Sequence, residues 1–401
     1  MGEKVMTGFP TRAQALEDFF AAWEPRGGIE LVPLDESCGR VLAEDVESLV
    51  TVPVVRASSC DGIAVRSADF ADGLPDTSAW RLGADYVRAD TGDDFPDEYD
   101  AVIMIEKAAI QPDGSVVLDD DVQVGPGAHT MPEGSTIRAG KLILKAGSII
   151  RPTDLAALCM GGLDMVKVRR KPVVAFIPTG SELIAPGMRP KRGQTINCNS
   201  LMCKHMLESY GAHALVFPIV RDNPEDLESA FTRALEVADF VVINGGSALG
   251  EEDFNVRMIE KRGHVVHHYI AAAPGRPLMM AVADGKPVVD LPGPPLAAYY
   301  GTDWCLQAVV CRMLGVPMPQ RQVVRAVSDS EYHSFGGFDM LGRWDVRREG
   351  DGLVAHPRNF RKGEQVECLT SNAHRISPIG EWDIATGDEI ELELIRGAEW
   401  L

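Results

Sequence analysis

The chain has 401 residues, of which 45% are hydrophobic and only 6% aromatic, so it is long enough for several domains with mainly aliphatic cores. Its formal net charge of −20 argues against nucleic acid or an anionic membrane as a partner, because basic surfaces bind both. There is no membrane-spanning apolar run, no signal peptide and no C-x-x-C pair among the eight cysteines, which favours a cytoplasmic protein with reduced thiols.

The N-terminal part of the chain begins with a predicted amphipathic helix at residues 11–23, capped by Thr11. From residue 31 to about residue 168, short runs of β-branched residues alternate with turn signals and predict a β-rich region. One helix at residues 154–160 interrupts this region, and its expected cap is Thr153.

After residue 171 the pattern changes to strands and helices in alternation, which predicts an α/β domain with a mainly parallel sheet. Ligands bind at the carboxyl ends of the strands in such sheets. Beyond Pro319, short strands with Gly-rich turns predict a small β-barrel. The strands expected in the α/β domain are 172–177, 214–220, 240–243, 278–282 and 287–290, and the helices are 201–210, a helix starting at Pro224, 254–262 and 296–314.

Four loops near predicted strand ends combine glycine with polar residues, namely 178–182, 245–253, 274–277 and 291–295. Glycines let backbone N–H groups approach a phosphate, and Glu182 has the chemistry to hold a divalent cation. A single loop of this kind is more often an ordinary turn, but four loops on one sheet edge favour an anionic ligand.

Other kinds of site are disfavoured by spacing. The chain has no Walker A motif, no H-E-x-x-H and no Rossmann glycine fingerprint, and residues 245–250 lack the G-x-S-x-G spacing of a serine hydrolase. His264, His267 and His268 do not share one face of a strand, so a surface or edge role is expected for them instead of a metal site.

An ordered series of motifs carries a resemblance to a known family. The series comprises residues 60–66, 178–183, 193–200, 220–224, 245–253, 274–277 and 291–293. In this order they resemble the molybdopterin molybdenumtransferase family, which includes bacterial MoeA and the E domain of gephyrin. The resemblance extends from about Thr11 to the C-terminal β region.

The resemblance implies a MoeA-like α/β multidomain fold, with a central α/β molybdopterin-binding domain flanked by β-rich domains. Residues 1–45 with 137–170 would form a linker and dimerisation domain. Residues 46–136 would form a β-rich domain that carries the D-G-x-A loop. Residues 171–318 would be the α/β domain and 319–401 the C-terminal barrel. The resemblance also implies a homodimer in which this loop meets the partner's α/β domain.

The activity implied is transfer of molybdenum from molybdate to adenylated molybdopterin, with Mg²⁺ and release of AMP. Position by position, the implied catalytic acids are Asp61, Glu182, Asp222 and Asp253, of which Glu182 and Asp253 would hold Mg²⁺. The implied substrate-binding residues are Thr91, Thr179, Gly180, Ser181, Gly245, Gly246, Ser247, Gly250, Pro274, Gly275, Arg276, Pro292 and Gly293.

Several positions depart from the family pattern and leave alternatives open. The departures are Ser181 and Cys198 for aspartates, Ser135 (close to Glu133) for an acid, Ala273 and Arg276 for lysines, and Pro294 and Ala297 for Asn and Ser. Lost donors weaken oxyanion capture, although the Arg276 guanidinium suits a tetrahedral oxyanion. The alternatives are a paralogue with weak or altered metal insertion and a non-enzymatic dimeric scaffold.

Overall fold

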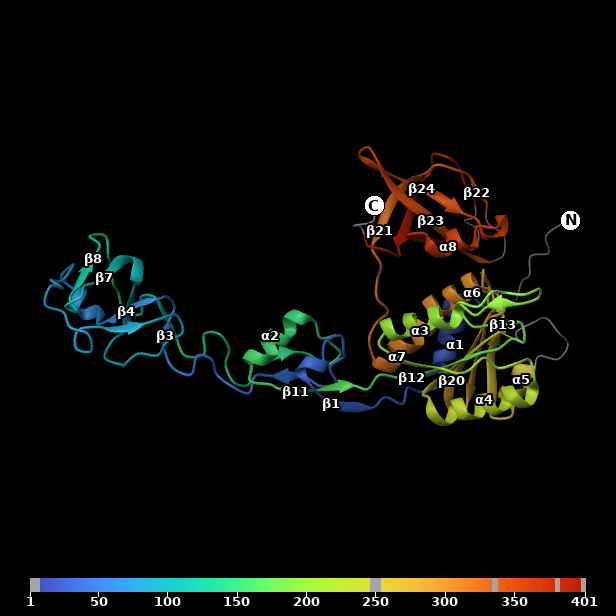
Figure 1. Ribbon diagram of the computed structural model, residues 1–401, viewed down its shortest axis with the longest axis horizontal. Helices are drawn as coiled ribbons and strands as arrows, with labels where there is room; N and C mark the ends of the chain where they lie inside the picture. The colour runs from blue at the N-terminus through green and yellow to red at the C-terminus, as the bar shows by residue number, and fades with distance from the viewer. Residues whose placement is uncertain (1–7, 246–253, 334–337, 379–382, 398–401) are drawn as a thin grey trace. The chain divides into compact units, whose positions relative to one another are not determined.

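The computed structural model describes residues 8–245, 254–333, 338–378 and 383–397 (Figure 1). The chain divides into two compact units: an inserted unit, Ile29–Arg169, and an α/β–barrel unit made of Met1–Gly28 and Arg170–Leu401. At the junction the N–H of Arg170 donates to the carbonyl of Gly28 at 2.8 Å. The division into four domains stays a prediction.

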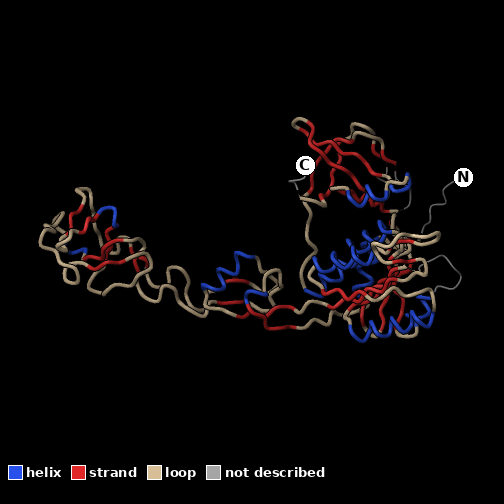
Figure 2. Tube along the Cα trace, in the orientation of Figure 1, coloured by secondary structure: helices blue, strands red, loops and turns tan. Residues whose placement is uncertain are grey.

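The inserted unit is β-rich, as predicted, and its strands are short (Figure 2). Strand β4 lies between β5 and β6, and β1–β11, β2–β10, β3–β9 and β7–β8 form antiparallel pairs. Its elements are β1 (Ile29–Pro33), η1 (Leu34–Glu36), β2 (Val46–Glu47), β3 (Ala57–Ser58), β4 (Gly62–Val65), η2 (Ser67–Phe70), β5 (Val87–Ala89), β6 (Ala101–Met104), η3 (Ile105–Lys107), β7 (Ala108–Ile110), β8 (Val116–Leu118), β9 (Thr130–Met131), β10 (Leu142–Leu144), α2 (Pro152–Met160) and β11 (Met165–Arg169).

Helix α2 begins earlier than expected, and the predicted cap at Thr153 is wrong. Arg151 is the N-cap residue, and Pro152 occupies the first helical position, where its missing N–H costs nothing. The Asp154 carboxylate accepts from the backbone N–H of Arg151 at 2.9 Å and so satisfies a free donor at the helix start.

The α/β sheet of the other unit has, in the described residues, six strands in the order β15-β12-β16-β20-β19-β17. The first four strands are parallel, while β19 and β17 are antiparallel to their neighbours. Helices α4 and α5 cover one face, and α3 and the α6–α7 helix cover the other (Figure 1). The bounds are α1 (Arg12–Ala21), β12 (Val173–Pro178), β13 (Leu183–Ile184), β14 (Thr195–Ile196), α3 (Asn199–Ser209), β15 (His213–Val216), α4 (Pro224–Val237), β16 (Phe240–Asn244), α5 (Phe254–Glu260), β17 (Gly263–His268), β19 (Met279–Ala283), β20 (Lys286–Leu291), α6 (Pro295–Tyr300), η4 (Gly301–Leu306) and α7 (Gln307–Leu314).

Two elements of this domain differ in detail from the prediction. The expected strand at 214–220 ends at Val216, and Val220 forms an isolated bridge with Thr179. The expected helix at 296–314 contains the π-helical turn η4 between α6 and α7. This turn carries Asp303, which is 5% exposed and forms an ion pair with Arg321.

The C-terminal strands close into a barrel, as predicted. In the described residues the order is β18-β23-β24-β21-β27-β25, and the additional pairing of β25 with β23 closes the circle. The elements are β18 (Ala272–Ala273), β21 (Val323–Ser328), β22 (Tyr332–His333), β23 (Asp339–Glu349), β24 (Gly352–Arg358), η5 (Phe360–Lys362), α8 (Gln365–Thr370), β25 (Ala373–Ser377), β26 (Asp383–Ile384) and β27 (Glu389–Leu394).

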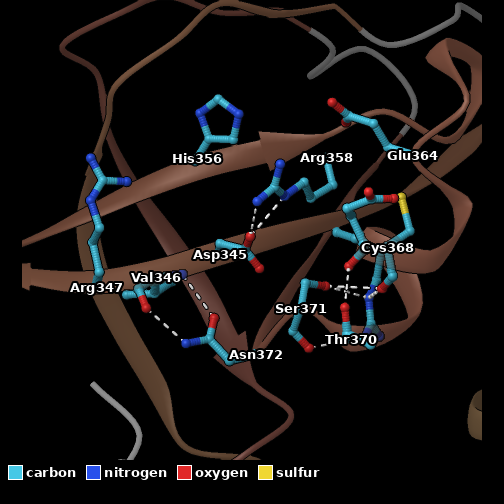
Figure 3. A network of polar contacts seen from close by, with 12 residues as sticks. Asp345, Val346, Arg347, His356, Arg358, Glu364, Cys368, Thr370, Ser371 and Asn372 are labelled. Carbon is cyan, nitrogen blue, oxygen red and sulfur yellow. Dashed lines mark hydrogen bonds and ion pairs between the residues drawn. The ribbon is translucent and has the colours of Figure 1, made fainter.

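Polar contacts stabilise the barrel (Figure 3). Arg358 donates to the Asp345 carboxylate, and the Asn372 side chain bonds to both backbone groups of Val346, accepting at 2.8 Å and donating at 2.7 Å. The Arg343 side chain is 2% exposed and donates to the carbonyl of Cys368 at 2.6 Å. Among the described residues, no helix is both long and apolar enough to cross a membrane.

Candidate functional site

The carboxyl ends of β12, β16 and β20 meet at one edge of the α/β sheet. The N–H of Thr179, just after β12, donates to the carbonyl of Asn244 at 2.9 Å, and the N–H of Gly245, just after β16, donates to the carbonyl of Leu291 at 3.1 Å. These bonds continue the strand pairing into the loops and hold them side by side. The loops predicted after β12, β16 and β20 therefore begin side by side at the edge where α/β proteins bind ligands.

A cavity of about 700 Å³ opens at this edge. Six of the predicted site residues line it, namely Thr179, Gly180, Glu182, Asp222, Gly245 and Gly293. Five asparagines that the prediction did not include line it too, namely Asn197, Asn199, Asn223, Asn244 and Asn255. The remaining wall is partly apolar, with Leu183, Ile196, Leu227 and Phe254. A pocket with apolar walls and convergent polar groups is typical of a small-molecule site.

Gly245 is required by the close packing of two of these loops. Its φ is +110°, a backbone region that other residues rarely adopt. A Cβ at this position would lie 2.5 Å from the carbonyl oxygen of Thr179, which is a backbone atom with little freedom to move. A glycine therefore allows the loops after β12 and β16 to touch.

Two of the predicted acids line the cavity together. Asp222 accepts from the N–H of Ser181 at 3.0 Å, and the N–H of Asp222 donates to the Ser181 hydroxyl at 3.1 Å. This reciprocal pair joins the loop after β12 to the segment before α4, so Ser181 orients Asp222 although it does not itself line the cavity. The Glu182 carboxylate lies close over Gly180, and in the described part of the chain it has no hydrogen-bond partner.

The described residues supply a partial ligand set for a divalent cation. They contain no group of three or more His, Cys, Asp or Glu side chains arranged to hold a metal ion. Glu182 and Asp222 still place two carboxylates on one cavity. That donor set fits Mg²⁺, which commonly takes one or two carboxylates and completes its shell with water and substrate phosphates.

The loop at residues 274–277 lies at the same sheet edge but outside the cavity wall. It follows β18, which pairs with β23 of the barrel, and it precedes β19. A Cβ on Gly275 would lie 3.8 Å from the carbonyl oxygen of Ala297, so this loop is a neighbour of α6. Pro274, Arg276 and Pro292 are likewise not among the cavity-lining residues.

Asp61 and Thr91, both predicted as site residues, lie together in the inserted unit. One Asp61 oxygen accepts from the backbone N–H of Thr91 at 2.7 Å and from its hydroxyl at 2.8 Å. Both bonds lower the pKa of the exposed Asp61 carboxyl, and the backbone bond has the larger effect. Asp61-Gly62 leads into strand β4, and Gly62 is required there because a Cβ would lie 2.0 Å from the carbonyl oxygen of Ile103.

Four of the predicted site residues fall between the described ranges 8–245 and 254–333. Gly246, Ser247, Gly250 and Asp253 lie outside the described residues. The three histidines expected at an edge are on β17, the last strand of the sheet, and His267 bonds to Asp18 at 2.7 Å.

Comparison with known proteins places the chain in a family. Residues 11–162 match the family model described as the MoeA N-terminal region (domain I and II), and residues 175–311 match the one described as a probable molybdopterin binding domain. The molybdopterin molybdenumtransferase of Haemophilus influenzae is 30% identical over 330 residues, covering 80% of each chain. This chain belongs to the molybdopterin molybdenumtransferase family.

Other members of the molybdopterin molybdenumtransferase family support the assignment over nearly the whole length. The enzyme of that name from Bacillus subtilis is 29% identical over 400 residues, covering 94% of this chain and 93% of the relative. The crystal structure of the molybdopterin biosynthesis moeA protein from Pyrococcus horikoshii is similar with a TM-score of 0.79 and 29% identity, covering 97% of this chain and 100% of that one. The cavity-lining residues fall within the matched binding domain.

Proposed function

We propose that the protein is a molybdopterin molybdenumtransferase of molybdenum cofactor biosynthesis. It transfers molybdenum from molybdate to adenylated molybdopterin, and the pyrophosphate bond of that substrate is cleaved with release of AMP. The observation that carries the proposal is the cavity at the carboxyl edge of the sheet, where glycine loops and two carboxylates converge within the matched binding domain.

The residues of the cavity suit an anionic pterin nucleotide. Gly180, Gly245 and Gly293 let the backbone approach phosphate oxygens closely, and the apolar wall gives a planar ring a surface to pack on. When bound, Mg²⁺ would shield the negative charge of the pyrophosphate, with Glu182 and Asp253 holding it and Asp222 nearby. Thr91 orients Asp61, which the family resemblance assigns to the same reaction.

Changing Glu182 to Gln tests this function directly. The change keeps the size of the side chain but removes the carboxylate charge, so AMP release should slow by about 10- to 100-fold with the fold intact. The measurement is AMP release from adenylated molybdopterin in the presence of molybdate and Mg²⁺.

Glu236→Gln is the matched control, because Glu236 lies exposed on α4 and does not line the cavity. That variant should release AMP at the parent's rate. If Glu182→Gln also retained the parent's rate, Glu182 would have no role in holding the cation. A parent protein that releases no AMP and inserts no molybdenum would contradict the function itself.

A homodimer is the second part of the proposal. Large apolar side chains of the inserted unit are exposed, including Ile29 at 59%, Leu31 at 59%, Leu49 at 68% and Val54 at 73%. Four of the seven residues from Leu49 to Val55 are both apolar and exposed, namely Leu49, Val50, Val54 and Val55, so the apolar positions are clustered in sequence. Exposed apolar clusters of this kind mark protein–protein interfaces. In the proposed dimer the Asp61 loop of one subunit completes the site of its partner.

The double substitution Leu49→Asp with Val54→Asp should weaken this dimer. Two charges placed in an apolar interface are expected to raise the dimer dissociation constant by about 100-fold or more. Sedimentation velocity over a range of concentrations measures the change. Val366→Asp, at a position 70% exposed on α8 of the barrel, is the control and should leave the dimer intact. A parent that sediments as a monomer would refute the homodimer.

The residue at position 297 favours one alternative, a paralogue with weak metal insertion. Ala297 stands where the family has a serine and is 3% exposed, so α6 offers no hydroxyl at that point. A parent that binds adenylated molybdopterin but inserts molybdenum only at very high molybdate would support this alternative.

All eight cysteines are free thiols, which supports a reducing compartment such as the cytoplasm as the proposed location.

A further inference from the structure

Two buried asparagines of the cavity wall form a hydrogen-bond network with the loop that follows β20. Asn199, at the start of α3, is 6% exposed, and Asn244, at the end of β16, is 4% exposed. The Asn199 amide donates to the Asn244 side-chain oxygen at 3.0 Å and to the carbonyl of Gly293 at 2.8 Å. The Asn244 amide donates to the carbonyls of Leu291 at 3.2 Å and Pro292 at 3.0 Å.

These bonds engage three successive carbonyls of the loop. An amide nitrogen carries two hydrogens, so both donors of each asparagine are used. The contacts join three segments that are far apart in sequence: the start of α3, the end of β16 and residues 291–293. The Leu291 carbonyl also accepts from the N–H of Gly245 at 3.1 Å.

The loop itself is poor in donors and rich in acceptors. Its sequence is Leu291-Pro292-Gly293-Pro294-Pro295, and proline has no backbone N–H, so Gly293 supplies the one N–H between positions 292 and 295. A carbonyl oxygen directed at a bound oxyanion repels it. Because the C=O and N–H of a planar trans peptide point in opposite directions, a Pro292 carbonyl held by Asn244 directs the Gly293 N–H away from Asn244. Gly293 is exposed and lines the cavity.

We propose that Asn199 and Asn244 are positioning residues for oxyanion binding: by engaging the carbonyls of residues 291–293, they make this loop accept a tetrahedral oxyanion. The oxyanion is either molybdate or a phosphate group of the pterin nucleotide. The inference deepens the proposed function and rests on it for the identity of the ligands. It assigns Asn199 and Asn244 a role through the loop and not through contact with the reacting atoms.

The test compares Asn199→Ala and Asn244→Ala with the parent in two binding measurements. Equilibrium dialysis with molybdate measures oxyanion affinity, and fluorescence titration with adenylated molybdopterin measures nucleotide affinity. Asn199→Ala frees the Gly293 carbonyl and Asn244→Ala frees the Pro292 carbonyl, so in each variant the affinity for the oxyanion bound there should fall by about tenfold. A shift in the molybdate isotherm identifies molybdate as that oxyanion, and a shift in the nucleotide isotherm identifies a substrate phosphate.

Asn372→Ala is the matched control. Asn372 also uses its amide to bond two backbone groups, those of Val346, but it lies in the barrel (Figure 3). It should lower the melting temperature and leave both isotherms unchanged, which separates positioning from general loss of stability. If Asn244→Ala does not fold, Asn199→Ala, which leaves both Asn244 bonds to the loop in place, carries the comparison.

The results for the role of the two asparagines can be told apart from those for the proposed transfer reaction. Variants whose two isotherms match those of Asn372→Ala would overturn the inference, as would a parent that binds neither ligand. A parent that binds both ligands but releases no AMP would refute the proposed transfer reaction, while the shifts would still decide the role of the asparagines.

Discussion

Replacing Gly245 with alanine is expected to lower the free energy of unfolding by about 3 kcal/mol or more and to reduce molybdenum insertion by at least about 100-fold. Two effects add. The residue is held at a φ of +110°, a region that costs an alanine roughly 1–3 kcal/mol. The new Cβ would also lie 2.5 Å from the Thr179 carbonyl oxygen, so the loops after β12 and β16 must separate.

Thermal unfolding and molybdate-dependent AMP release measure the two effects. Gly293→Ala is the control for stability, because Gly293 lies on the same cavity and a Cβ there would meet nothing within 4 Å. Its melting temperature should stay close to the parent's. A Gly245→Ala protein as stable as Gly293→Ala would show that the two loops can move apart at little cost.

Replacing Arg321 with methionine is expected to cost about 3 kcal/mol of stability, because removal of one partner of a buried ion pair leaves the other charge uncompensated. Asp303, the partner, is 5% exposed on the π-helical turn η4. Arg321 also lies 3.3 Å from the His374 ring and 3.6 Å from the Glu393 carboxylate, so one side chain links the helix to the barrel.

Arg325→Met provides the comparison. Arg325 pairs with Glu391 at 3.0 Å, but the two side chains are 68% and 63% exposed, and exposed pairs contribute about 0–1 kcal/mol. Denaturant unfolding of both variants gives the difference between the two losses of stability. Equal losses for the two substitutions would mean that burial of Asp303 adds nothing to the pair.

The layout of the fold was predictable because it depends on local patterns. The alternation after residue 171 predicted the α/β sheet, and the turn-rich sequence beyond Pro319 predicted the barrel. The cap of α2 was missed because Thr153 is a common cap residue, while Arg151 acts through the Asp154 side chain three residues later. The π-helical turn was missed because a helix with one widened turn keeps nearly the same apolar pattern.

The candidate site was predicted only in part, because some of its features follow from local sequence patterns and others do not. Glycine loops after strands are visible in the sequence, and strand order brought Thr179, Gly245 and Gly293 to one cavity. Asn199 and Asn244 were not recognised because an asparagine next to a helix start or a glycine usually signals a cap or turn. Their partners lie 45 to 94 residues away, and no local pattern encodes such contacts.

The hydrogen bond between Arg170 and Gly28 shows how the inserted unit is attached to the rest of the chain. The chain enters and leaves the inserted unit at residues that are already joined by a 2.8 Å hydrogen bond, and α1, before the junction, packs on β17 and β19, after it. The 141 residues from Ile29 to Arg169 therefore occupy the position of a single long loop. An insertion at this point requires no rearrangement of the sheet order, because domain insertion is tolerated where the two ends of a gap lie close together.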